Sequence, residues 1–136
     1  MLNPSVIAVV DDDEDIRDAL SDLLFAMGYN CQAFDGAEAF LAADATGRFD
    51  CLITDIRMPG MSGLELLQQL QAAGSIMPVI VVTSVTDPVT RSRALASGAH
   101  AYLTKPVTDD ILLQSLGTAL AGRDMPRDDE DGPSGR

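Results

Sequence analysis

The stretch Cys51-Leu52-Ile53-Thr54-Asp55-Ile56-Arg57-Met58-Pro59-Gly60-Met61-Ser62-Gly63 places an aspartate directly after a short apolar run. Apolar runs without polar alternation are typical of strands that are buried on both faces, as in a parallel sheet. The Pro-Gly pair that follows predicts a turn. Ser62, with Glu65 three residues later, predicts the start of a helix. The stretch therefore reads as strand, carboxylate, turn and helix.

The same order recurs along the chain. Apolar strands are predicted near residues 5–10, 31–34, 50–54, 78–83 and 100–104. Helices with one apolar face are predicted near 14–27, after an Asp35 and Glu38 N-cap pair, after Ser62, from Asp87-Pro88 to about 97, and from a Thr108 cap to about 120. Strands that alternate with helices, joined by right-handed crossovers, predict a doubly wound α/β fold around a parallel sheet.

The composition narrows the class of protein. The chain has 136 residues and a net charge of -12, which argues against direct binding of nucleic acid. We expect one folded domain over residues 1–120 and a disordered acidic tail over 121–136. No apolar stretch is long enough for a transmembrane helix and no signal peptide is visible, so we expect a cytoplasmic protein with no membrane contact.

The two cysteines, Cys31 and Cys51, both fall in predicted strands. If the first strand lies between theirs, two strand spacings separate them by roughly 9–10 Å. That distance is too long for a disulfide. We therefore expect two free cysteines that serve as small core residues.

Polar side chains follow four of the predicted strands. Asp11 and Asp12 follow the first, Asp55 the third and Lys105 the fifth, and Thr83 ends the fourth. Ligands of open parallel sheets bind beyond the carboxyl ends of the strands, so this edge is the expected site. Lys105 is also the only lysine of the chain.

Three converging carboxylates repel each other unless a cation lies among them. Oxygen ligands favour a hard cation, and Mg²⁺ is the expected cofactor at Asp11, Asp12 and Asp55. Mg²⁺ readily takes a phosphoryl oxygen as a further ligand, and a carboxylate can itself accept a phosphoryl group. The Thr83 hydroxyl and the Lys105 ammonium would then stabilise the transferring group.

Four motifs in this order resemble the receiver domain of two-component response regulators. Their sequences are most similar to those of FixJ-like receivers. They are Val9-Val10-Asp11-Asp12-Asp13, Asp55-Ile56-Arg57-Met58-Pro59-Gly60-Met61-Ser62-Gly63, Val82-Thr83-Ser84 and Leu103-Thr104-Lys105-Pro106. The resemblance covers about residues 5–120. It implies a flavodoxin-like (βα)5 fold with strand order 2-1-3-4-5. It also implies a phosphorelay protein rather than an enzyme.

The resemblance assigns a role to each site residue. Asp55 matches the acceptor of a phosphoryl group from a histidine kinase or phosphotransfer protein. Asp12 matches the direct Mg²⁺ ligand, Asp11 its acidic neighbour, and Arg57 the residue whose backbone carbonyl completes the metal shell. Lys105 matches the lysine before a proline that is usually cis-linked.

The resemblance also implies a readout. Thr83 matches the switch hydroxyl and Tyr102 the aromatic switch. We expect phosphorylation to draw Thr83 toward the phosphoryl group and to turn Tyr102 into the space that it leaves. The face formed by helix 88–97, strand 100–104 and helix 108–120 would then bind an unidentified downstream protein or a second receiver as a homodimer.

Three alternatives stay open at this stage. Asp11-Asp12-Asp13 also fits the Asp-x-Asp motif of a haloacid-dehalogenase-type phosphatase, although the Asp55 motif would then be unexplained. A pseudo-receiver that binds without being phosphorylated is opposed by the complete set of site residues. The chain reads as a stand-alone receiver, and the alternative is a truncated receiver from a DNA-binding FixJ-like regulator.

Overall fold

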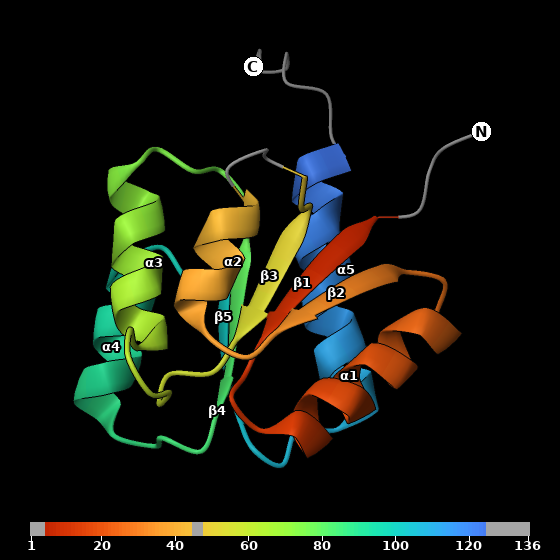
Figure 1. Ribbon diagram of the computed structural model, residues 1–136, viewed down its shortest axis with the longest axis horizontal. Coiled ribbons are helices and arrows are strands. Elements are labelled where there is room, and N and C mark those ends of the chain that lie inside the picture. The colour runs from red at the N-terminus through yellow and green to blue at the C-terminus, as the bar shows by residue number, and fades with distance from the viewer. Residues whose placement is uncertain (1–4, 45–47, 125–136) are drawn as a thin grey trace.

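The computed structural model describes residues 5–44 and 48–124. Strands and helices alternate through these residues, as Figure 1 shows. The elements are β1 (Val6–Val10), α1 (Glu14–Ala26), β2 (Asn30–Phe34), α2 (Ala37–Asp44), β3 (Cys51–Thr54), α3 (Gly63–Ala72), β4 (Val79–Thr83), α4 (Pro88–Ala96), β5 (Ala101–Thr104) and α5 (Asp109–Asp124).

The strands form one parallel sheet in the order β2-β1-β3-β4-β5, which confirms the expected fold. β1 lies between β2 and β3, and its Ile7 pairs with Cys31 on one side and with Cys51 on the other. Neither cysteine forms a disulfide, and Cys51 is fully buried while Cys31 is partly buried. The expectation of two unlinked cysteines is confirmed, because a whole strand separates them.

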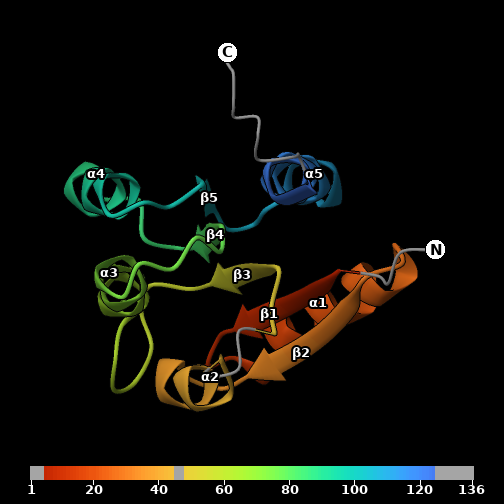
Figure 2. The same ribbon diagram turned by 90° about the horizontal axis from the view of Figure 1, so that it is seen from above.

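Helices cover both faces of the sheet. In Figure 2, α1 and α5 lie on one side of the strands and α2, α3 and α4 lie on the other. Two hydrophobic cores correspond to these layers. Leu24 and Leu116 pack in the core under α1 and α5, and Phe40 and Leu66 pack in the core under α2 and α3. The strands β1, β3 and β4 are buried almost throughout, because they contribute to both cores. The edge strand β2 is more exposed and carries the polar residues Asn30 and Gln32.

Three of the predicted helix N-caps are confirmed. The Ser62 hydroxyl accepts the Glu65 N–H, and the Glu65 carboxylate accepts the Ser62 N–H, which makes a reciprocal cap for α3. The Asp87 carboxylate accepts the Val89 N–H at the start of α4. The Thr108 hydroxyl accepts the Ile111 N–H at the start of α5.

Two expectations need correction. The predicted N-cap pair of Asp35 and Glu38 is wrong, because α2 begins at Ala37 and the Glu38 carboxylate binds the Met61 N–H instead. The last helix was expected to end near residue 120, but α5 continues to Asp124. From residue 125 onward, the predicted acidic tail lies outside the described residues.

Within the described residues, no helix combines the length and the apolar character that crossing a membrane requires.

Candidate functional site

The carboxyl ends of the strands bring three aspartates together. Asp11 directly follows β1 and is 3% exposed, and Asp55 directly follows β3 and is 8% exposed. Asp12 is exposed beside them. One carboxylate oxygen from each of the three lies within 4.8 Å of the other two. Like charges this close need a cation among them, and an all-oxygen ligand set suits a hard ion.

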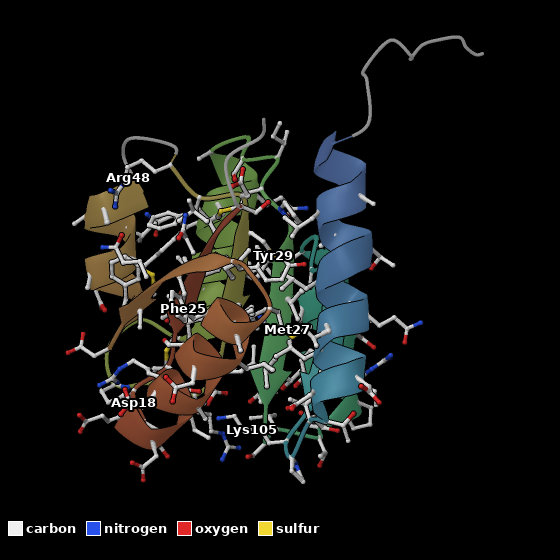
Figure 3. All side chains as sticks on the ribbon, turned by 90° about the vertical axis from the view of Figure 1, so that its right-hand side faces the viewer. Asp18, Phe25, Met27, Tyr29, Arg48 and Lys105 are labelled. Carbon is white, nitrogen blue, oxygen red and sulfur yellow. The ribbon has the colours of Figure 1, made fainter. Side chains whose placement is uncertain are left out.

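Lys105 connects two of these carboxylates. Its Nζ lies 3.0 Å from Asp11 Oδ2 and 2.9 Å from Asp55 Oδ2. Burial lowers the pKa of the Lys105 ammonium, but its hydrogen bonds to Asp55 and Asp11 and their negative charges outweigh burial, so this pKa lies above its ordinary value. Lys105 lies at the end of the molecule where the carboxyl ends of the strands meet, and Arg48 lies at the opposite end (Figure 3). The Lys105–Pro106 peptide bond is cis, as the resemblance implied.

The backbone around Asp55 fixes the direction of its carboxylate. The Ile56 N–H donates to Asp55 Oδ1 at 2.6 Å, while Oδ2 accepts from Lys105. The Gly63 N–H donates to the Ile56 carbonyl at 2.8 Å, which folds the loop after β3 back on itself. Gly63 lies so close to the Asp55 carbonyl oxygen that a Cβ would overlap it. The motif therefore requires glycine at 63 for a steric reason.

The loop after β1 is held by several partners. The Asp13 N–H donates to Asp11 Oδ1 at 2.9 Å, and the Asp11 N–H donates to the Phe34 carbonyl at 3.2 Å. Arg17 Nη1 donates to the Asp11 carbonyl at 2.7 Å. Sequence reasoning missed Arg17, although it is the one basic residue among the acids that begin α1. Its guanidinium adds positive charge beside the carboxylates.

A cavity of about 350 Å³ opens next to Asp55. Its lining includes two further residues expected at the site, Arg57 and Thr83. Thr83 is fully buried, and its Oγ1 accepts the Val85 N–H at 3.3 Å. The full lining is Asp55, Arg57, Thr83, Ser84, Val85, Thr86 and Asp87. A small anion that reached Asp55 through this cavity would pass the Thr83 hydroxyl.

Tyr102 already points inward. It is 8% exposed, and its hydroxyl donates to the Val85 carbonyl at 2.7 Å. Burial raises the pKa of the Tyr102 phenol, and the charges of Asp55 and Asp87 raise it further. In this structure, therefore, the Tyr102 ring is buried and its hydroxyl is bonded to the loop that follows Thr83.

The structure thus brings Asp11, Asp12, Asp55 and Lys105 into one cluster, and it places Arg57 and Thr83 around the adjoining cavity. Tyr102 lies outside this cluster, and its hydroxyl binds the carbonyl of Val85, which lines the cavity.

Comparison with known proteins identifies the family. The model of the response regulator receiver domain matches residues 7–117. The transcriptional regulatory protein FixJ of Bradyrhizobium diazoefficiens is 39% identical over 84% of this chain and 56% of its own length. The transcriptional regulatory protein TdiR of Thauera aromatica is 35% identical over 88% of this chain and 52% of its own length. This chain therefore spans about half the length of these curated relatives.

Solved structures agree with this result. The crystal structure of FixJ-N superposes with a TM-score of 0.81 at 33% identity, over 88% of this chain and 96% of that one. The chemotaxis protein CheY4 of Vibrio cholerae superposes with a TM-score of 0.80 at 29% identity, over 86% of this chain and 99% of that one. Fold, site geometry and sequence agree, and the chain belongs to the receiver domain family of two-component response regulators.

Proposed function

We propose that this chain accepts a phosphoryl group on Asp55 from a histidine kinase or phosphotransfer protein and that it then changes a protein-interaction surface. The observation that carries the proposal is the position of Lys105, whose ammonium bonds to both Asp11 and Asp55 beside a third carboxylate. A stability role alone does not account for this cluster, because three carboxylates that repel each other meet beside the single ammonium of Lys105.

The residues around Asp55 suit nucleophilic attack. Its carboxylate is held by the Ile56 N–H and by Lys105, so the oxygens are oriented before the donor arrives. An Asp55 oxygen forms the new bond to phosphorus as the bond between phosphorus and the donor's nitrogen breaks, and the leaving imidazole takes a proton from solvent. The Lys105 ammonium and the Thr83 hydroxyl then donate to the phosphoryl oxygens.

The acidic cluster fits Mg²⁺. Asp11, Asp12 and Asp55 supply carboxylate oxygens, and the Arg57 carbonyl would be a further ligand from the loop after β3. When bound, Mg²⁺ neutralises negative charge on the transferring phosphoryl group. The Asp13 N–H and Lys105 hold the Asp11 carboxylate, and Arg17 holds the Asp11 main-chain carbonyl, so the ligand is oriented in advance.

The readout would pass through α4. Thr83 binds the Val85 N–H, Tyr102 binds the Val85 carbonyl, and α4 follows this loop. Ala94 is the residue that α4 buries, so few contacts hold the helix to the sheet. If Thr83 turns toward the phosphoryl group, Val85 loses a partner and the loop becomes free to shift. The two packings would differ in population before and after phosphorylation.

The surface that changes would be the face of α4, β5 and α5. Val89 and Leu95 of α4 are 63% and 37% exposed, and Ile111 of α5 is 48% exposed. Exposed large apolar side chains on neighbouring elements favour a protein partner. We propose a homodimer or a downstream protein as the occupant. The same surface would serve a stand-alone receiver or the receiver of a longer regulator, such as the transcriptional regulators that this chain resembles over about half their length.

Phosphorylation by acetyl phosphate with Mg²⁺ tests the proposal. We expect one phosphoryl group per chain, mapped to Asp55 by mass spectrometry, and no labelling of Asp55→Asn. Labelling elsewhere in the wild-type protein would contradict the assignment. Repeated turnover of a phosphate ester would instead favour the phosphatase alternative.

Asp12→Ala tests the metal site. The side chain is exposed, so the variant should fold, and its Mg²⁺ binding should be lost because one carboxylate ligand is removed. Isothermal titration calorimetry measures the affinity. Unchanged Mg²⁺ affinity in Asp12→Ala would remove Asp12 from the ligand set.

A further inference from the structure

A hydrogen bond joins α2 to the loop that follows Asp55. The Met61 N–H donates to Glu38 Oε2 at 2.9 Å, and the two residues are 23 positions apart. Figures 1 and 2 both show the loop between β3 and α3 beside α2. The hydrogen bond from the Met61 backbone lowers the pKa of the Glu38 carboxyl, so this acceptor is ionised at neutral pH.

The loop backbone at Gly60 also comes close to the same Glu38 carboxylate. The φ of Gly60 is +77°, and a Cβ built on it would lie 2.7 Å from Glu38 Oε2. The loop therefore approaches the carboxylate as closely as a residue without a side chain allows. The hydrogen bond at Met61 and the close approach at Gly60 therefore set the position of the loop over the first turn of α2.

The segment that carries Glu38 also touches the other half of the acidic cluster. The Phe34 carbonyl, at the end of β2, accepts the Asp11 N–H at 3.2 Å. The short segment from Phe34 to Glu38 thus contacts both loops that would supply metal ligands. One loop carries Asp11 and Asp12, and the other carries Arg57.

We propose that Glu38 is a positioning residue for the metal site, because it holds the loop after β3 where the Arg57 carbonyl can reach the ion. This inference rests on the proposed function, which places Mg²⁺ among Asp11, Asp12 and Asp55. Glu38 itself touches neither the ion nor the phosphoryl group. Its loss weakens metal binding while the nucleophile and Lys105 keep their places.

Three variants test the role. Glu38→Met removes the acceptor and the charge, whereas Glu38→Gln removes the charge but keeps an oxygen that can accept the Met61 N–H. Glu65→Met is the matched control, since it removes a carboxylate that binds the Ser62 N–H within the α3 cap. Glu38 and Glu65 are both exposed, so each variant should fold. Glu38→Ala replaces Glu38→Met if the methionine variant does not fold.

Calorimetry should show that Glu38→Met raises the Kd for Mg²⁺ about five-fold, the effect of one net hydrogen bond. Glu38→Gln should stay close to the wild-type value, and so should Glu65→Met. In acetyl phosphate assays, Glu38→Met should need about five-fold more Mg²⁺ for its half-maximal rate but should reach the wild-type maximal rate. A residue that only stabilises the fold would not raise the Mg²⁺ requirement while leaving the maximal rate unchanged.

Several outcomes would overturn the inference. They are an unchanged Kd in Glu38→Met, equal effects of Met and Gln, an equal effect of Glu65→Met, or a maximal rate that high Mg²⁺ does not restore. If wild-type protein binds Mg²⁺ but takes no phosphoryl group, the proposed function fails while the Kd values still decide the role of Glu38. If wild-type protein binds no Mg²⁺, both fail.

Discussion

Lys105 Nζ lies 2.9 Å from Asp55 Oδ2, although 50 positions of the chain separate the two residues. The same nitrogen also binds Asp11, so one ammonium is shared between two carboxylates that are almost buried. The lysine thus offsets their repulsion in the absence of a metal ion. This relationship makes the site sensitive to any change in its charge balance.

Lys105→Met should lower the free energy of unfolding by about 2 kcal/mol in metal-free buffer, since the two carboxylates lose their shared partner. Added Mg²⁺ should recover part of the loss, because a cation again lies among the acids. Urea unfolding with and without Mg²⁺ measures both effects. Equal stability of variant and wild type without metal would show that the ion pair contributes nothing.

The raised pKa of Tyr102 predicts a defined dependence of stability on pH. A group whose folded-state pKa is raised holds its proton more tightly in the folded state. The stabilisation is therefore complete below the unfolded-state pKa of about 10 and is lost as pH rises through the folded-state value. The stability difference between wild type and Tyr102→Phe should be constant below about pH 10 and should shrink above it.

Ultraviolet titration of Tyr29→Phe checks the cause of that effect, because Tyr102 is then the only tyrosine left of the two in the chain. Its phenol should ionise above the ordinary pH of about 10 in the folded protein and at the ordinary pH in urea. Ionisation at the same pH in both states would contradict the prediction.

Gly63→Ala should lower the free energy of unfolding by about 2–3 kcal/mol or more, because the new Cβ would overlap the Asp55 carbonyl. Gly117→Ala is the control, since an added Cβ in α5 meets nothing within 4 Å. That change should raise stability by about 0.5–1 kcal/mol, because alanine favours a helix over glycine. Thermal unfolding compares the two. A well-tolerated alanine at 63 would mean that the loop can move away from Asp55.

Hydrogen exchange should locate the switch. Amides of α4 should exchange faster than those of β4, because α4 buries little and every residue of β4 is buried. A beryllofluoride mimic of the phosphorylated state should change protection within residues 84–104. Unchanged protection there, with Asp55 shown to be occupied, would exclude this output surface. In Tyr102→Phe, the mimic should cause a smaller change in protection of residues 84–104. The Val85 carbonyl then lacks the tyrosine hydroxyl both with and without the mimic.

The alternation of strands and helices and the edge that carries the site could be predicted from local patterns. A buried strand is mostly apolar, and a polar residue that ends or follows it lies at the edge of the sheet. Asp11, Asp55, Thr83 and Lys105 each follow or end such a run, so their convergence needs only the assumption of parallel strands. The strand order came from the family resemblance.

Tertiary structure decided the partners of individual side chains. Asp35 and Glu38 have the spacing of a helix cap, but α2 begins at Ala37 and Glu38 binds Met61. The spacing of Asp35 and Glu38 is the same whether Glu38 caps the helix or binds Met61, so it cannot distinguish the two. Contacts between positions 23, 50 or 94 apart, such as those of Glu38 and Lys105, depend on how whole elements pack. Sequence alone thus determined which elements form and where their polar ends meet, because these follow from local periodicity. Packing of the layers decided which groups bind each other, because only the assembled fold sets the distances between them.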